Sequence, residues 1–281
     1  MGRDLVIGDI HGAHRALEQC LERCEFDKDN DRLITLGDIC DGWPYVYECV
    51  EILLTIKNRI DIIGNHDHFL HTWLKTMAHP DYWSQGGKGT AISYLRNAGK
   101  DVDEYNIIPL RDQYGRPFTG FEFPLDPFDI PPEHQSFFKG QHLYYKDDKN
   151  RLFVHAGFYD KNRTLKENQQ SNPSDFYWNR DLWKIAQGAK GGRLKFAELL
   201  SEIFIGHTST TNWTTKEIFT DGGIILPKGL PITEPMYADI IINIDTGAGS
   251  NGKLTIMDID THEYWQSDCV NQFYGDYKPR G

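Results

Sequence analysis

The chain has 281 residues, of which 39% are hydrophobic and 13% aromatic, a composition that indicates a folded globular protein and argues against a disordered one. Its formal net charge of −11 disfavours a protein that grips nucleic acid over its whole surface, because that requires an excess of lysine and arginine. The five cysteines form no disulfide framework. With no signal-peptide pattern and no apolar run of about 20 residues, we expect a cytoplasmic protein.

The first quarter of the chain alternates between strand and helix patterns. We expect strands at 4–10, 33–36 and 60–63, and helices at 13–24 and 45–56. This β-α-β-α-β order predicts a parallel sheet with right-handed crossovers. Ligands of such sheets bind outside the carboxyl ends of the strands. Asp9, Asp38 and Asn65 each lie just past such an end, so the sequence predicts that they meet at one edge of the sheet.

The middle of the chain is rich in glycine and proline. Helices are expected at 66–77 and 88–98, separated by a glycine-rich loop at 83–89. Residues 109–132 hold six of the 13 prolines, and we expect this composition to exclude regular strand or helix interior. The segment is either a surface excursion packed by its own aromatic residues or a cover over the active site. Both alternatives remain open.

The second half is dominated by strand patterns. A hairpin is expected from 142–145 and 151–154, and further strands at 202–205, 240–244, 254–257 and near 264–265. No linker or internal repeat interrupts the chain. We therefore predict one α/β domain over residues 1–281, in which two mixed sheets flanked by helices form four α/β/β/α layers.

Five short segments each place an oxygen or imidazole ligand directly after a strand-like run. Together they supply Asp9, His11, Asp38, Asn65, His155 and His207. Carboxylate and carbonyl oxygens suit hard divalent cations, and imidazole suits manganese, iron and zinc. A two-metal centre also needs an oxygen ligand that bridges both ions, a role open to Asp38. The joint pattern predicts a two-metal centre that hydrolyses phosphate esters.

On these motifs the chain resembles the calcineurin-like metallophosphoesterases. Within them it is most similar to the phosphoprotein phosphatase branch, which includes phage lambda phosphatase and bacterial symmetrical diadenosine tetraphosphatases. The similarity continues into residues 243–249. The resemblance implies two metal sites that share Asp38. The first would be held by Asp9, His11 and Asp38, and the second by Asp38, Asn65, His155 and His207.

The resemblance also assigns roles to neighbouring residues. His66 would be the general acid that protonates the leaving oxygen, and Asp41 would orient it and raise its pKa. Arg180 matches a phosphate-binding arginine of the bacterial members. The family usually has a second arginine directly after the residue matching Asp41, but this chain has Gly42. Lys88 is a candidate for the missing positive charge.

The activity implied is hydrolysis of phosphate monoesters by a two-metal-activated hydroxide, as in Ser/Thr protein phosphatases. The alternative is a dinucleoside polyphosphate (diadenosine tetraphosphate) hydrolase, and the absent arginine shifts weight toward it. We expect two divalent ions, manganese first and iron or zinc as alternatives. The expected partner is a phosphorylated protein or nucleotide, rather than nucleic acid or a membrane. A nucleic-acid end-processing enzyme and a non-catalytic metal-binding module are the remaining alternatives.

Overall fold

Two five-stranded sheets form the centre of the computed structural model, which describes residues 2–79, 83–112, 114–158, 160–188, 194–214 and 229–279. The strands of the first sheet are β1 Asp4–Ile7, β2 Arg32–Thr35, β3 Asn58–Asp61, β11 Thr255–Asp258 and β12 Tyr264–Gln266. Those of the second are β6 Tyr144–Lys146, β7 Arg151–Val154, β8 Glu202–Ile205, β9 Met236–Ala238 and β10 Ile241–Asn243. Their orders are β12-β11-β1-β2-β3 and β6-β7-β8-β10-β9.

The pairing of the strands confirms the predicted parallel core of the first sheet. β1 pairs in parallel with β2, and β2 with β3, whereas β11 joins β1 in the antiparallel sense. In the second sheet, β8 is parallel to both β7 and β10. The carboxyl ends of β1, β2 and β3 therefore lie at one edge, as the positions of the expected ligands require.

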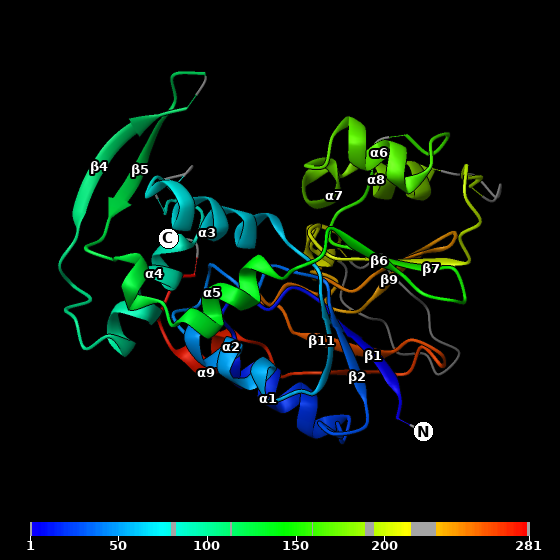
Figure 1. Cartoon of the computed structure of the whole chain (residues 1–281), viewed down its shortest axis with the longest axis horizontal. Coiled ribbons are helices and arrows are strands. Elements are labelled where there is room, and N and C mark those ends of the chain that lie inside the picture. The colour runs from blue at the N-terminus through cyan, green and yellow to red at the C-terminus, as the bar shows by residue number, and fades with distance from the viewer. Residues whose placement is uncertain are drawn as a thin grey trace.

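Helices cover the outer face of each sheet (Figure 1). The first group is α1 His14–Arg23, α2 Val46–Leu54, α3 Asn65–Thr76, α4 Gly87–Asn97 and α5 Pro132–Lys139, whose buried side chains share one apolar cluster with the first sheet. The second group is α6 Leu165–Ser171, α7 Asp175–Trp178 and α8 Asp181–Gly188, which share a cluster with β7, β8 and β10. The predicted α/β/β/α layering is thus confirmed.

The two sheets pack against each other through strands that are buried on both faces. In β1, Val6 belongs to the cluster between the sheets, while Leu5 and Ile7 belong to the cluster under the helices. The second sheet contributes Phe153 of β7 and Phe204 of β8 to the same cluster, and the rings of these two register partners stack with centroids 5.0 Å apart. Successive side chains of a strand point to opposite faces of the sheet, and both faces are covered here. Every residue of β1 except its first is therefore fully buried.

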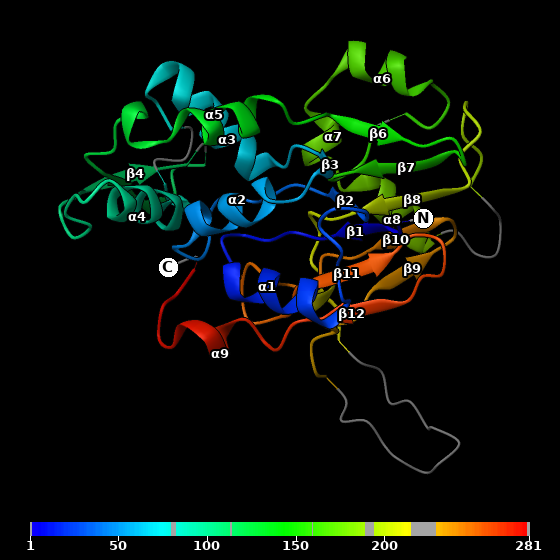
Figure 2. The ribbon, with the colours of Figure 1, turned by 60° about the horizontal axis from the view of Figure 1, so that its bottom comes forward.

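The proline-rich segment contradicts the expectation that it contains no regular strand. β4 Asn106–Arg111 and β5 Pro117–Glu122 form an antiparallel ribbon, in which Pro109 stands opposite Thr119. A two-stranded ribbon leaves one edge of each strand unpaired, so proline can occupy it without removing a ladder hydrogen bond. Figure 2 shows this ribbon beside α4, at one end of the molecule. Its role as a cover over the site stays a prediction.

The chain is completed by short elements near the carboxyl terminus and in the loops. They are α9 Asn271–Tyr274 and the 3₁₀ helices Pro127–Asp129 and Thr210–Asn212. Within the described residues, no helix is both long and apolar enough to cross a bilayer.

Candidate metal centre

The loops that follow the strands hold three predicted ligands and Asp41 in unusual backbone conformations. His11, Asp38, Asp41 and His207 have φ angles of 50°, 50°, 64° and 64°, in the left-handed region. A residue with a Cβ atom pays about 1–2 kcal/mol to adopt this conformation. Such strain clusters at functional sites because the surrounding structure must enforce it. The four positions are therefore held by their packing rather than by local preference.

Asp38 lies at the centre of the predicted ligands. Its Oδ2 atom is 3.6 Å from His11 Nε2 and 3.4 Å from His155 Nε2. Two buried groups have potential ligand atoms that all lie within 4.8 Å of one another: His11 with Asp38 and His66, and Asp38 with His155 and His207. Asp38 is common to both groups, which is the position that a bridging ligand needs.

Asp9 and Asn65 lie beside these groups. Asn65 Oδ1 is 3.1 Å from His155 Nε2. The backbone N–H of His207 donates to Asp9 Oδ2 at 3.0 Å, and Asp9 Oδ1 lies 4.0 Å from His155 Nδ1. The structure thus brings all six predicted ligands together, although the first compact group contains His66 where the resemblance implied Asp9.

Backbone carbonyl groups orient two of the imidazoles. His11 Nδ1 lies 3.1 Å from the carbonyl oxygen of Cys40, and His155 Nδ1 lies 2.7 Å from that of Leu36. An Nδ1–H that donates to a carbonyl leaves the Nε2 lone pair available for a cation. In both rings this Nε2 atom faces Asp38, so the orientation suits metal binding.

The charges of the site fit divalent cations. Burial raises the pKa of Asp9 well above its usual value, and the nearby carboxylates of Asp245 and Asp38 add to the effect. Burial acts in the same direction on Asp38, but the imidazoles of His155 and His66 outweigh it and hold the pKa of this carboxyl well below its usual value. Buried carboxylates and imidazoles this close are the donor set that manganese, iron or zinc binds.

His66 and Asp41 form a buried pair next to the ligands. His66 Nδ1 lies 2.8 Å from Asp41 Oδ2, and the hydroxyl of Thr90 donates to Asp41 Oδ1 at 2.7 Å. The backbone N–H of His66 donates to Asp38 Oδ1 at 3.0 Å. An Nδ1–H donated to Asp41 leaves Nε2 as the ring atom that can carry a transferable proton.

Asp67 holds the ligand loops together, a role that the sequence interpretation missed. This fully buried carboxylate accepts the backbone N–H groups of Ile39, Cys40 and Gly64 at 2.9, 3.0 and 3.0 Å, and the amide of Gln141 at 2.9 Å. The available signal was its position, since an acidic residue three places after the N-cap of a helix commonly forms a capping box. Here that N-cap is Gly64 of α3.

Gly42 has a backbone conformation that side chains rarely adopt. Its φ is +96°, and a Cβ atom added there would lie 3.0 Å from both the Cβ and the carbonyl oxygen of His11. Its N–H donates to the carbonyl of Gly86 at 2.8 Å. The local backbone conformation therefore favours glycine over arginine at this position.

Lys88, the candidate replacement for that arginine, interacts with the ribbon. Its Nζ atom lies 4.7 Å from the ring centroid of Tyr105 and 5.2 Å from that of Phe121. It also lies within 3.4 Å of the Tyr105 hydroxyl. The charge of Lys88 thus helps to hold β5 against α4 through cation–π contacts.

Arg180 borders a cavity that reaches the ligands. Its Nη1 donates to the carbonyl of His207 at 2.7 Å and to Thr208 Oγ1 at 3.0 Å. The cavity has a volume of about 420 Å³ and is lined by His11, Arg180, His207, Thr208, Ser209, Thr211, Asn212, Asp245, Gly247, Gly249 and Ser250. The predicted phosphate-binding arginine therefore shares a hollow with two predicted ligands.

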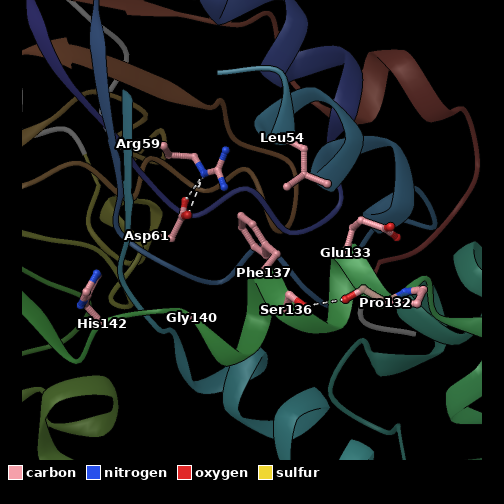
Figure 3. Close-up of a pocket in the computed structure, with 9 residues that line it drawn as sticks. All are labelled: Leu54, Arg59, Asp61, Pro132, Glu133, Ser136, Phe137, Gly140 and His142. Carbon is pink, nitrogen blue, oxygen red and sulfur yellow. Dashed lines mark hydrogen bonds and ion pairs between the residues drawn. The ribbon is translucent and has the colours of Figure 1, made fainter. Parts of the chain in front are cut away.

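A second cavity, of about 560 Å³, lies near the ends of α2 and β3 and against α5 (Figure 3). Two of its charged groups form an ion pair, because Arg59 Nε lies 2.7 Å from Asp61 Oδ2. The guanidinium also lies 5.1 Å from the ring centroid of Phe137. None of the predicted ligands lines this cavity. The candidate substrate site is therefore the cavity lined by Arg180, His11 and His207.

The calcineurin-like phosphoesterase family model matches residues 3–217. The chain belongs to this family. The resemblance inferred from the ligand motifs is thereby confirmed, and with it the assignment to a family of hydrolases that use divalent metals.

Two similar curated proteins are named as nucleotide hydrolases. A symmetrical bis(5'-nucleosyl)-tetraphosphatase from Coxiella burnetii is 35% identical over 65 residues, which is 23% of this chain and 22% of that protein. The match thus spans about a fifth of this relative. The asymmetrical bis(5'-nucleosyl)-tetraphosphatase PrpE of Bacillus cereus is 23% identical over 265 residues, or 89% of this chain and 87% of that protein.

Solved structures of other phosphatases share the fold. A putative diadenosine tetraphosphatase has a TM-score of 0.57 at 15% identity, with 94% of this chain and 92% of that chain covered. A protein serine/threonine phosphatase from Saccharomyces cerevisiae has a TM-score of 0.51 at 13% identity, with 99% and 83% covered. At these identities the likeness concerns the fold alone.

Proposed function

We propose that this calcineurin-like phosphoesterase is a dinuclear metal-dependent hydrolase of phosphate esters, of the Ser/Thr protein phosphatase type. The observation that carries the proposal is the position of Asp38, which belongs to both groups of potential ligands and also accepts the backbone N–H of His66. The candidate bridging ligand Asp38 thus accepts a hydrogen bond from the backbone of the candidate acid His66.

The ligands divide into two sets in this proposal. Asp9, His11 and Asp38 would hold one ion, and Asp38, Asn65, His155 and His207 the other. Divalent ions at these positions supply an activated water molecule and neutralise phosphate charge. We propose manganese, with iron or zinc as alternatives.

The remaining steps depend on side chains of this chain. His66 Nε2 would donate a proton to the leaving oxygen, while the contact of its Nδ1 with Asp41 fixes the ring. Arg180 would bind phosphate oxygens, because a guanidinium matches their geometry. This role is supported by the cavity that Arg180 shares with His11 and His207.

A second candidate, hydrolysis of dinucleoside polyphosphates, is favoured by Gly42. Its backbone conformation is poorly suited to the clamping arginine of the phosphoprotein phosphatases. The PrpE relative, which matches most of this chain, is named for this kind of activity. A nucleotide is therefore a candidate substrate, as is a phosphoprotein. The cytoplasmic location expected from the sequence stays a prediction.

Metal-free protein offers a direct test. The chain would be assayed with manganese, iron, zinc or magnesium on p-nitrophenyl phosphate, phosphopeptides and a dinucleoside tetraphosphate, and the products would be identified. We expect turnover only with metal. Orthophosphate as the sole product would favour the monoesterase, and nucleotide products would favour the second candidate. No turnover of any substrate with any ion would refute the proposed function.

A further inference from the structure

We propose that Trp178 is a stacking platform for a nucleobase beside the metal centre, so that the substrate is a nucleoside polyphosphate. This inference rests on the proposed metal-dependent hydrolysis of phosphate esters and favours its second candidate, dinucleoside polyphosphates, by adding a residue that selects the substrate. Neither the ligand pattern nor the family assignment gives a role to this side chain.

Trp178 completes an arc of aromatic rings around one side of the site. Its ring centroid lies 5.8 Å from that of His207 at an interplanar angle of 88°, and 5.6 Å from that of Phe69. Phe69 in turn lies 5.6 Å from the ring of His66. The arc therefore runs from the proposed acid to a proposed metal ligand, on the side where the leaving group would depart.

The backbone under Trp178 is anchored on several sides. Tyr177 stacks on His68 of α3, with centroids 4.8 Å apart, and the carbonyl of Phe176 accepts the N–H of Ala156 at 2.9 Å. The carbonyl of Trp178 itself lies 3.2 Å from His207 Nε2. A ring carried by such a segment is held ready before a ligand binds, which lowers the entropic cost of stacking.

The exposure of Trp178 separates it from its helix neighbours. Phe176 is fully buried and Tyr177 is 8% exposed, whereas Trp178 is 39% exposed. A large ring that closes a core would be covered on all sides. One that keeps an accessible surface beside a reaction centre offers a planar group a surface on which to stack, as aromatic residues do for bases in single-stranded nucleic acids.

The cavity that His207 and Arg180 line argues for a nucleotide rather than a phosphotyrosine. Its lining includes the hydroxyls of Thr208, Thr211 and Ser250 and the guanidinium of Arg180. These groups suit a chain of phosphates and a ribose. A phosphotyrosine side chain has an aromatic ring but little to occupy such a polar cavity, whereas a nucleoside polyphosphate has parts for both surfaces.

The test compares a substrate that carries bases with one that does not. Trp178→Ala, Trp178→Leu and Trp178→Phe would be assayed with a dinucleoside tetraphosphate and with methyl triphosphate, alongside phosphotyrosine peptides. Tyr264→Ala is a matched control, because Tyr264 is also 39% exposed but lies on β12. Metal content and circular dichroism would be recorded for each variant.

We expect Trp178→Ala and Trp178→Leu to lower kcat/KM for the dinucleoside tetraphosphate about ten-fold more than for methyl triphosphate, mainly through KM. Trp178→Phe should recover most of the loss, and Tyr264→Ala should match the wild type. An equal loss on both substrates, or a loss confined to phosphotyrosine peptides, would overturn the platform while leaving the proposed function intact. A wild-type protein without turnover of any phosphoester would instead remove the proposed function itself.

Discussion

His66 Nδ1 and Asp41 Oδ2 lie 2.8 Å apart, in a contact that joins the first turn of α3 to the loop after β2. Both side chains are buried, and Thr90 of α4 donates to the other carboxylate oxygen. The pair is thus held by three separate elements, and its orientation does not depend on bound substrate.

Replacement of His66 should separate catalysis from metal binding. We expect His66→Asn to keep both ions and to lower kcat by about a hundred-fold or more, because general acids contribute at this scale. The loss should be larger for alkyl phosphates than for p-nitrophenyl phosphate, whose leaving group needs little protonation. Kinetics with both substrates and elemental analysis check this, and full activity on alkyl phosphates would contradict the acid role.

Asp38→Asn should remove metal and activity together. The amide lacks the charge needed beside two cations, and Asp38 is the residue common to both groups of ligands. Elemental analysis after dialysis should show loss of both ions, with turnover at background. Asp268→Asn is the control, because Asp268 is an exposed carboxylate paired with Arg23 and should leave metal content unchanged.

Gly42→Ala should affect stability and activity, whereas Gly99→Ala should affect stability alone. Both glycines have positive φ angles, +96° and +69°, but only a Cβ atom at position 42 meets another atom, His11. We expect each variant to lose about 1–2 kcal/mol of unfolding free energy from the backbone alone. Urea unfolding and phosphatase assays test this. Equal activity of the two variants would show that the contact with His11 is unimportant.

Removal of metal should destabilise the protein. Without cations, burial raises the pKa of Asp9, and the nearby carboxylates of Asp245 and Asp38 add to the effect. Burial of Asp9 and its repulsion by these two carboxylates therefore oppose folding. A ligand present at about a hundred times its Kd adds about 2.7 kcal/mol to stability. Calorimetry should therefore show a lower Tm after chelation and recovery with manganese. An unchanged Tm would mean that the ions bind weakly or not at all.

Acid should weaken the fold through His79. Burial lowers the pKa of this histidine from 6.5 to about 4, and its ring stacks on Trp83 with centroids 4.4 Å apart. The unfolded chain binds the proton more tightly, so stability is full above pH 6.5 and falls as the pH drops toward 4, by up to about 3 kcal/mol. His79→Asn should flatten this part of the curve of unfolding free energy against pH. If His79→Asn left the slope of unfolding free energy against pH unchanged, His79 would not be the group responsible.

The clustering of the predicted ligands could be anticipated from sequence because their positions follow from the strands. Asp9, Asp38 and Asn65 each come after an apolar run, and parallel strands bring their carboxyl ends to one edge. The second sheet adds His155 and His207 after β7 and β8 in the same way. To infer that these residues lie close together, we needed only the order of strands and helices and the positions of the polar residues after each strand.

Other parts of the site depend on contacts that the sequence does not display. Thr90 supports Asp41 across 49 residues, and Asp67 binds backbone N–H groups, which every segment possesses. The role of Trp178 depends on how α7 packs against α3. The ribbon of β4 and β5 was missed because proline counts against strands in general, although the unpaired edges of a two-stranded ribbon tolerate it.

The predicted ligands come from both sheets, and this divides the site between distant parts of the chain. Asp9, Asp38 and Asn65 belong to loops of the first sheet, whereas His155 and His207 follow strands of the second. Neither half of the sequence holds a full set. Bound ions would therefore act as a cross-link between the two sheets. The affinity for metal would in turn depend on how stably the two sheets pack against each other.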